Sequence, residues 1–70
     1  MDMEKIGKRI KEIRTEHGLS QQKFGAILSV SQDTISLWEK GKSVPTTEFL
    51  IAIATQFEVS VDYILCLTEY

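Results

Sequence analysis

The sequence predicts an all-α, compact domain of five short helices, at residues 3–17, 21–28, 32–40, 47–57 and 61–67. Two features of the 70 residues predict this fold class. Apolar residues recur at three- and four-residue spacing, which places them along one face of a helix. Serines stand where helices begin and glycines where they end, because a serine oxygen accepts a bond from a free helical amide and glycine adopts left-handed backbone easily.

The first predicted helix has one apolar face and mixed charged faces. Met3, Ile6, Ile10 and Ile13 recur at helical spacing, and Gly18 follows as the helix end. The charged faces can be solvated, or one of their basic residues can contact a phosphate, and both readings stay open. These positions are Lys5, Lys8, Arg9, Lys11 and Glu12.

Residues 20–41 predict two short helices joined by a tight turn. Ser20 and Ser31 are placed to cap the two helices, and Gly41 ends the second. Glycine inside a helix costs roughly 1 kcal/mol relative to alanine, so a close helix crossing would explain Gly25. This arrangement describes a helix-turn-helix, whose second helix can enter the major groove of DNA.

Both of these helices have an apolar face. Phe24, Ile27 and Leu28 share one face of the first helix, and Ile35 and Trp38 share one face of the second. The spacing from Ile35 predicts that the indole of Trp38 belongs to the core and does not stack on a base.

The segment resembles the helix-turn-helix of the phage repressor/Cro-type, or lambda-repressor-like, family. Residues 45–65 resemble the fourth and fifth helices of that family, so the resemblance covers nearly the whole chain. It implies a five-helix domain that binds double-stranded DNA. The matching residues of the motif are Ser20, Gln21, Leu28, Val30, Ser31, Thr34, Ile35, Ser36, Trp38, Glu39 and Gly41.

The sequence departs from the family pattern at five positions. Phe24 and Gly25 stand where Leu-Ala is usual, and Thr47 replaces a leucine. Ser29 and Glu58 stand where the family has glycine. If Ser29 takes a left-handed conformation, the cost is on the order of 1 kcal/mol. None of these positions faces the groove, so the departures bear on stability more than on function.

The outward side of residues 32–40 presents four candidates for reading bases. Gln32 can pair with adenine N6 and N7, and Asp33 can accept from the N4 amine of cytosine. Leu37 can rest against a thymine methyl, and Ser36 can serve a base or a phosphate. Alternatives stay open, because Gln32 can be solvated, the helix dipole alone favours Asp33 there, and Leu37 can have a packing partner.

Five residues are candidates for phosphate contacts. Helix N-termini present free amides to anions, and the resemblance implies such a contact for Gln21. Two lysines and free backbone amides follow the predicted recognition helix, which favours a phosphate clamp at Lys40, Lys42 and Ser43. Ser31 caps the same helix and completes the set.

The resemblance also implies a structural ion pair between Arg14 and Glu39, formed as a bidentate fork. The alternative is an exposed arginine that the dipole favours near the end of the first helix. His17 has the same dipole explanation, and a metal or catalytic role for this single histidine is not expected.

The last two predicted helices raise the question of a partner surface. Leu50, Ile53, Ala54 and Phe57 form a buried stripe. The neighbouring Phe49, Ile51 and Ala52 can extend the core or face a partner. Many members of the family dimerise through this end. The candidate dimer or partner residues are Phe49, Tyr63, Leu67 and Tyr70.

Composition and charge limit which other functions are expected. The net charge of −2 argues at first against nucleic acid, but residues 43–70 hold no lysine or arginine, so the acidic part can face away from DNA. One histidine and one cysteine, Cys66, give no expectation of a metal site, a cofactor or an enzyme. No signal peptide or membrane span is visible, so a cytoplasmic location is expected, and no effector pocket is apparent.

The sequence therefore predicts a single domain, residues 1–70, that binds specific double-stranded DNA as a transcriptional regulator of the repressor kind. One helix reads too few base pairs to single out a genomic site. A homodimer on an inverted repeat, with half-sites about 34 Å apart, solves this. The alternative is a protein-binding module or antitoxin of the same fold, in which DNA binding is secondary.

Overall fold

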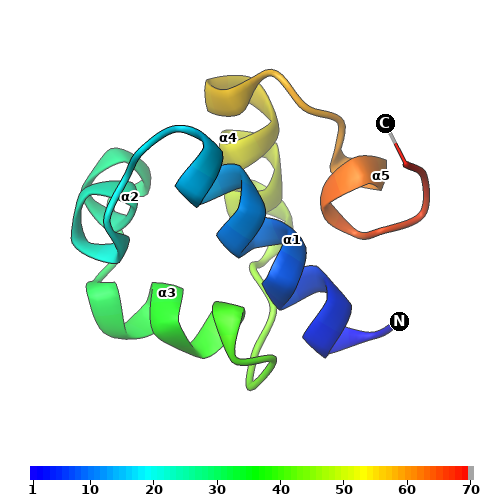
Figure 1. Ribbon diagram of the computed structural model, residues 1–70, viewed down its shortest axis with the longest axis horizontal. Helices are drawn as coiled ribbons and strands as arrows, with labels where there is room; N and C mark the ends of the chain where they lie inside the picture. The colour runs from blue at the N-terminus through cyan, green and yellow to red at the C-terminus, as the bar shows by residue number, and fades with distance from the viewer. Residues whose placement is uncertain (70) are drawn as a thin grey trace.

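A computed structural model of the chain describes residues 1–69 and contains five helices in that range. They are α1 (Met3–Glu16), α2 (Gln21–Leu28), α3 (Gln32–Glu39), α4 (Thr47–Phe57) and α5 (Val61–Ile64). Figure 1 shows α1 in the middle of the molecule, with α2 and α3 to one side of it and α5 to the other. Helix α4 passes behind α1 in this view, so the five helices surround one interior.

The core contains side chains from all five helices. The ring of Phe57 stacks on that of Phe24 with the centroids 5.2 Å apart, which joins α4 to α2. The buried apolar residues are Ile6, Ile10, Ile13, Phe24, Leu28, Ile35, Trp38, Ile53, Phe57 and Ile64.

Two residues that we expected on apolar faces lie outside this core. Met3 is 37% exposed, because it is the first residue of α1 and lies at the open end of the helix beside the Gly41 turn. Ile27 is 43% exposed. The buried face of α2 is formed by Phe24, Gly25 and Leu28, and Ile27 is rotated about 100° from Leu28, away from Gly25.

Two glycines mark places where backbone lies against backbone. A Cβ on Gly7 would overlap the carbonyl oxygen of Trp38 and lie 2.8 Å from that of Glu39, so α1 approaches the end of α3 closely only because residue 7 is glycine. A Cβ on Gly25 would lie 2.6 Å from the carbonyl oxygen of Val30. The nearest neighbour of Gly25 is therefore the turn, where the Val30 amide bonds back to the Gly25 carbonyl at 2.9 Å. The Ile35 side chain of α3 lies 3.4 Å from the same Cβ position, so the helix crossing that we expected is close there as well.

All five helices end in the same way. One residue takes left-handed backbone, and the next amide bonds to the carbonyl five residues earlier, as in the Schellman motif. Two of the left-handed residues are glycine and three carry side chains, each at a cost of roughly 1–2 kcal/mol. The left-handed residues are Gly18, Ser29, Gly41, Glu58 and Cys66.

This ending shortens the last helix relative to the sequence prediction of residues 61–67. Helix α5 stops at Ile64, because Cys66 has φ +62° and the Leu67 amide bonds to the Asp62 carbonyl at 2.8 Å. Helices α1 and α3 each end one residue earlier than predicted, since His17 and Lys40 are their C-caps. The predicted caps at Ser20 and Ser31 form, since each serine accepts an amide of its helix. Ser60 caps α5 in the same way, whereas the side chain of Thr46, before α4, makes no such bond.

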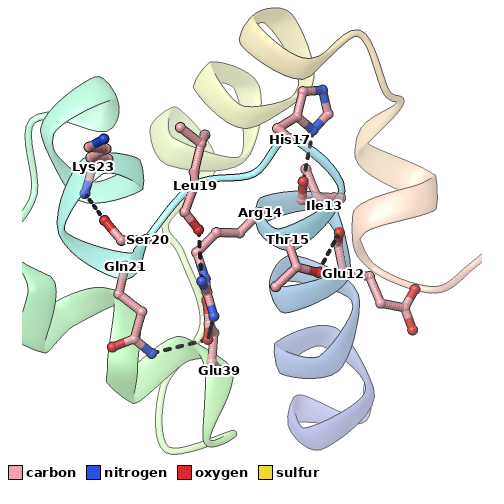
Figure 2. A network of polar contacts seen from close by, with 10 residues as sticks. All are labelled: Glu12, Ile13, Arg14, Thr15, His17, Leu19, Ser20, Gln21, Lys23 and Glu39. Carbon is pink, nitrogen blue, oxygen red and sulfur yellow. Dashed lines mark hydrogen bonds and ion pairs between the residues drawn. The ribbon is translucent and has the colours of Figure 1, made fainter.

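An ion pair joins α1 to the last residue of α3 (Figure 2). Arg14 Nε donates to Glu39 Oε2 at 2.6 Å, and Arg14 Nη2 donates to Glu39 Oε1 at 3.0 Å. Arg14 Nη1 donates to the carbonyl of Leu19 at 2.9 Å, in the loop that leads into α2. The side chains are only 12% and 5% exposed, so Arg14 is not the exposed arginine of the alternative reading.

A second arginine fastens α5 to α1. Arg9 Nη1 donates to the carbonyl of Tyr63 at 2.6 Å, and the guanidinium lies 3.9 Å from the centroid of the Tyr63 ring, as a cation–π contact. Arg9 is therefore not a solvated charge, while the phosphate contact by one of the basic residues of this helix stays a prediction. Exposed Glu12 lies 3.7 Å from Arg9 on the outer side.

Replacing Glu39 with alanine would leave the Arg14 guanidinium largely buried without its partner. We expect Glu39→Ala to lower the free energy of unfolding by about 2–4 kcal/mol, somewhat less than for a fully buried pair. Urea denaturation measures this change. Glu12→Ala is the matched control, because Glu12 is 60% exposed and lies 3.7 Å from Arg9 within α1, so its removal should change stability by no more than about 0.5 kcal/mol. Equal effects of the two substitutions would contradict this account of the ion pair.

Replacing Ser29 with glycine should relieve left-handed strain without removing a side-chain contact. We expect Ser29→Gly to raise the free energy of unfolding by about 0.5–1 kcal/mol. Ala26→Gly is the control, since Ala26 is an exposed residue within α2. This substitution should lower the free energy of unfolding by about 1 kcal/mol. Urea denaturation measures both changes, provided that the dependence of the free energy of unfolding on urea concentration is unchanged. A lower free energy of unfolding for both variants would refute the strain at Ser29.

Candidate nucleic-acid interface

The outward side of α3 is open to solvent. Gln32 and Asp33 are exposed and Ser36 is half-buried, while Leu37 is 46% exposed in spite of its apolar side chain. The opposite side of α3 is closed by the buried side chains of Ile35 and Trp38. The four candidate base readers therefore lie on one accessible face of a helix that the core holds rigidly from behind.

Phosphate candidates lie at the C-terminal end of α3. Gln21 is the first residue of α2, and its Nε2 donates to Glu39 Oε1 at 3.1 Å (Figure 2). Lys40 follows Glu39 directly and Lys42 comes two residues later; both are exposed, and Ser43 is half-buried. Within residues 1–69, no carboxylate oxygen lies within 4.0 Å of either ammonium group. The start of α2 thus meets the end of α3 at Glu39, and the loop that carries the two lysines begins at the next residue.

Ser31 lies at the other end of α3. Its Oγ accepts the Thr34 amide at 3.2 Å and lies 3.0 Å from Thr34 Oγ1. The hydroxyl is exposed, although its main partner is the helix that it caps. The phosphate candidates therefore bracket the base readers, with Ser31 before α3 and the group around Gln21 and Lys40 after it.

The predicted partner surface is only partly available. Phe49 packs against Trp38, with the ring centroids 5.9 Å apart, so it extends the core. Tyr63 lies under the guanidinium of Arg9 and packs against the core. Leu67 is 71% exposed, and Tyr70 lies outside the described residues. Of the described candidates, Leu67 is the one whose side chain is mostly exposed to solvent.

Several features of this structure were not predicted from the sequence. Asp2 caps α1 by accepting the amides of Glu4 and Lys5, and an acidic residue just before an apolar periodic run was the available signal. The close approach at Gly7 and the contact of Arg9 with Tyr63 depend on which helices meet in space, so no local sequence pattern predicts them.

Other kinds of site find little support in residues 1–69. No group of three or more His, Cys, Asp or Glu residues in that range is arranged to hold a metal ion. His17 Nδ1 lies 2.8 Å from the carbonyl of Ile13 at the end of α1 and, since a carbonyl only accepts, the nitrogen carries the hydrogen. None of the described helices has the length and apolar character needed to cross a membrane.

Comparison with known proteins identifies the motif. A family model described as Helix-turn-helix matches residues 10–64. The chain is 40% identical over 55 residues to antitoxin PezA of Streptococcus pneumoniae, which is 79% of this chain and 35% of PezA. It is 35% identical over 60 residues to the transcriptional activator BcrR of Enterococcus faecalis, which is 86% of this chain and 29% of BcrR. The chain thus spans about a third of the length of each of these relatives.

A solved structure resembles this one throughout the fold. The P22 c2 repressor, crystallised in complex with a synthetic operator, superposes with a TM-score of 0.79 at 32% sequence identity. The match covers 84% of this chain and 89% of the repressor chain. The full-length repressor C2 of Salmonella phage P22 is 32% identical over 65 residues. By its motif, its matching family model and this superposition, the chain belongs to the phage repressor-type, lambda-repressor-like helix-turn-helix family.

Proposed function

We propose that this chain is a sequence-specific double-stranded DNA-binding transcription regulator, a repressor that acts by occupying its operator. Helix α3 enters the major groove, and Gln32, Asp33, Ser36 and Leu37 meet base edges. The observation that carries the proposal is the accessible face of α3, which has Ser31 at one end and Gln21 with the exposed Lys40 at the other. An apolar side chain kept at 46% exposure in that face, Leu37, fits a thymine methyl.

The charge distribution supports this orientation on DNA. Lys40 and Lys42 stand beside the groove-facing side chains, whereas α4 and α5 contain acidic residues and no basic ones. An anionic duplex is therefore attracted to the end of α3, where the two exposed lysines lie, rather than to α4 or α5. Because the net charge is −2, sequence-independent binding should be weak, and affinity should depend on matched contacts.

We propose that the active unit is a homodimer on an inverted repeat. Eight residues of α3 reach only a few base pairs, which do not single out a site in a genome. Two copies related by a two-fold axis place two recognition helices about 34 Å apart, one turn of B-DNA. Exposed Leu67 is the described candidate for the dimer contact. A regulator of bacterial or phage genes acts in the cytoplasm, where the DNA is.

One comparison favours a second function. The likeness to antitoxin PezA, at 40% identity, supports a role as an antitoxin or protein-recognition module in which DNA binding is secondary. The two functions differ in what the α3 face does. A regulator loses its activity when that face is altered, whereas a protein-binding module retains its partner.

A selection from random-sequence duplexes, with the mass of the protein measured at the same concentration, tests the main proposal. We expect enrichment of an inverted repeat and a dimer mass on that DNA. The affinity should fall steeply with salt, because each phosphate contact releases counterions. No enrichment at low salt would refute the regulator and leave the antitoxin-like function.

Two substitutions separate base reading from phosphate contact. Gln32→Ala should cost about 1–3 kcal/mol of binding free energy and relax the preference at one base pair of each half-site. Lys42→Ala should weaken binding equally for all sequences and lower the salt slope by about 1. Repeating the selection and the salt titration on both variants measures these effects. An unchanged base preference for Gln32→Ala would remove Gln32 from the set of base readers.

A further inference from the structure

The carboxylate of Glu39 has two partners on the same oxygen. Oε1 accepts from Arg14 Nη2 at 3.0 Å and from Gln21 Nε2 at 3.1 Å, while Oε2 accepts from Arg14 Nε at 2.6 Å (Figure 2). Gln21 opens α2, where free helical amides favour an anion. The ion pair that joins α1 to α3 is therefore also in contact with a phosphate candidate.

The charge of Glu39 decides which way the Gln21 amide faces. An ionised carboxylate only accepts hydrogen bonds, so Gln21 must turn its NH₂ group, and not its carbonyl, toward Oε1. One hydrogen of that NH₂ group is then used, and the second remains for another acceptor. A phosphate oxygen is such an acceptor, whereas the Gln21 carbonyl would repel it.

The charge of Arg14 makes this arrangement compatible with DNA. A lone carboxylate beside a phosphate-binding donor would repel the phosphate. Arg14 compensates the charge in a bidentate pair, in which the two side chains are 12% and 5% exposed. Arg14 also binds the carbonyl of Leu19, two residues before Gln21, so that it fixes the backbone entering α2.

We infer that Glu39, held by Arg14, is a positioning residue for DNA binding, which presets the Gln21 amide as a phosphate donor before DNA arrives. This inference rests on the proposed DNA-binding function and deepens it. Donors held in the bound geometry lose little rotamer freedom on binding, so the contact contributes more to affinity than a mobile glutamine would.

A double-mutant cycle on the dissociation constant tests the inference, with the duplex enriched in the selection as the probe. In the wild-type background, Gln21→Ala should weaken binding about tenfold or more, as expected for a hydrogen bond to a charged group. Glu39→Gln removes the charge that orients the amide. In that background, the same Gln21→Ala change should weaken binding by less than about twofold.

Lys42→Ala is the control for the cycle. Its phosphate contact does not involve Glu39, so its loss should be the same in both backgrounds. The effects of Gln21→Ala and Glu39→Gln on binding can instead simply add, while the wild-type protein binds the duplex and Lys42→Ala weakens that binding. This result would refute the positioning role and leave the DNA-binding function standing. If the wild-type protein binds no duplex, the proposed function itself fails.

A measurement on the wild-type protein without DNA keeps the inference testable should Glu39→Gln fail to fold. The ¹⁵N relaxation of the Gln21 side-chain amide reports its mobility on the picosecond to nanosecond timescale. We expect an order parameter close to that of the rigid backbone, roughly 0.85, and a clear drop in a folded Glu39→Gln variant. A mobile Gln21 amide in the wild-type protein, with an order parameter below about 0.6, would overturn the inference.

Discussion

The pair between Arg14 and Glu39 is the interaction on which the geometry of this molecule depends. The core alone would allow the short helices α2 and α3 to settle in several ways, since apolar contact has little direction. The bidentate fork, with its further bond to the Leu19 carbonyl, specifies one arrangement of α1, the loop before α2 and the end of α3. Glycine at position 7 is part of the same constraint, because it lets the helices come close enough for the pair to form.

Most of the secondary structure could be predicted from the sequence because its signals are local. Serine caps at Ser20, Ser31 and Ser60 and glycine ends at Gly18 and Gly41 mark boundaries that the structure reproduces within a residue. The exception is the end of α5. There Cys66 adopts the left-handed backbone conformation, and cysteine has no known preference for this conformation that would predict it.

The site was harder to predict than the fold. Which face of α3 is exposed follows from the spacing of Ile35 and Trp38, and the exposure of Leu37 follows with it. The bond between Gln21 and Glu39, and the place of Arg9 against Tyr63, depend on contacts between distant parts of the chain. Long polar side chains have many rotamers, and only the assembled fold selects one of them.

The contact of Arg9 with Tyr63 has a consequence for how the molecule opens. Helix α5 has four residues, and isolated helices shorter than about 12–15 residues are marginal in water. Its order therefore depends on the guanidinium supplied by α1 and on Ile64 in the core. A segment held in this way detaches at a lower free energy than the whole domain unfolds. We therefore expect that α5 opens locally at a lower free energy than the helix-turn-helix unfolds.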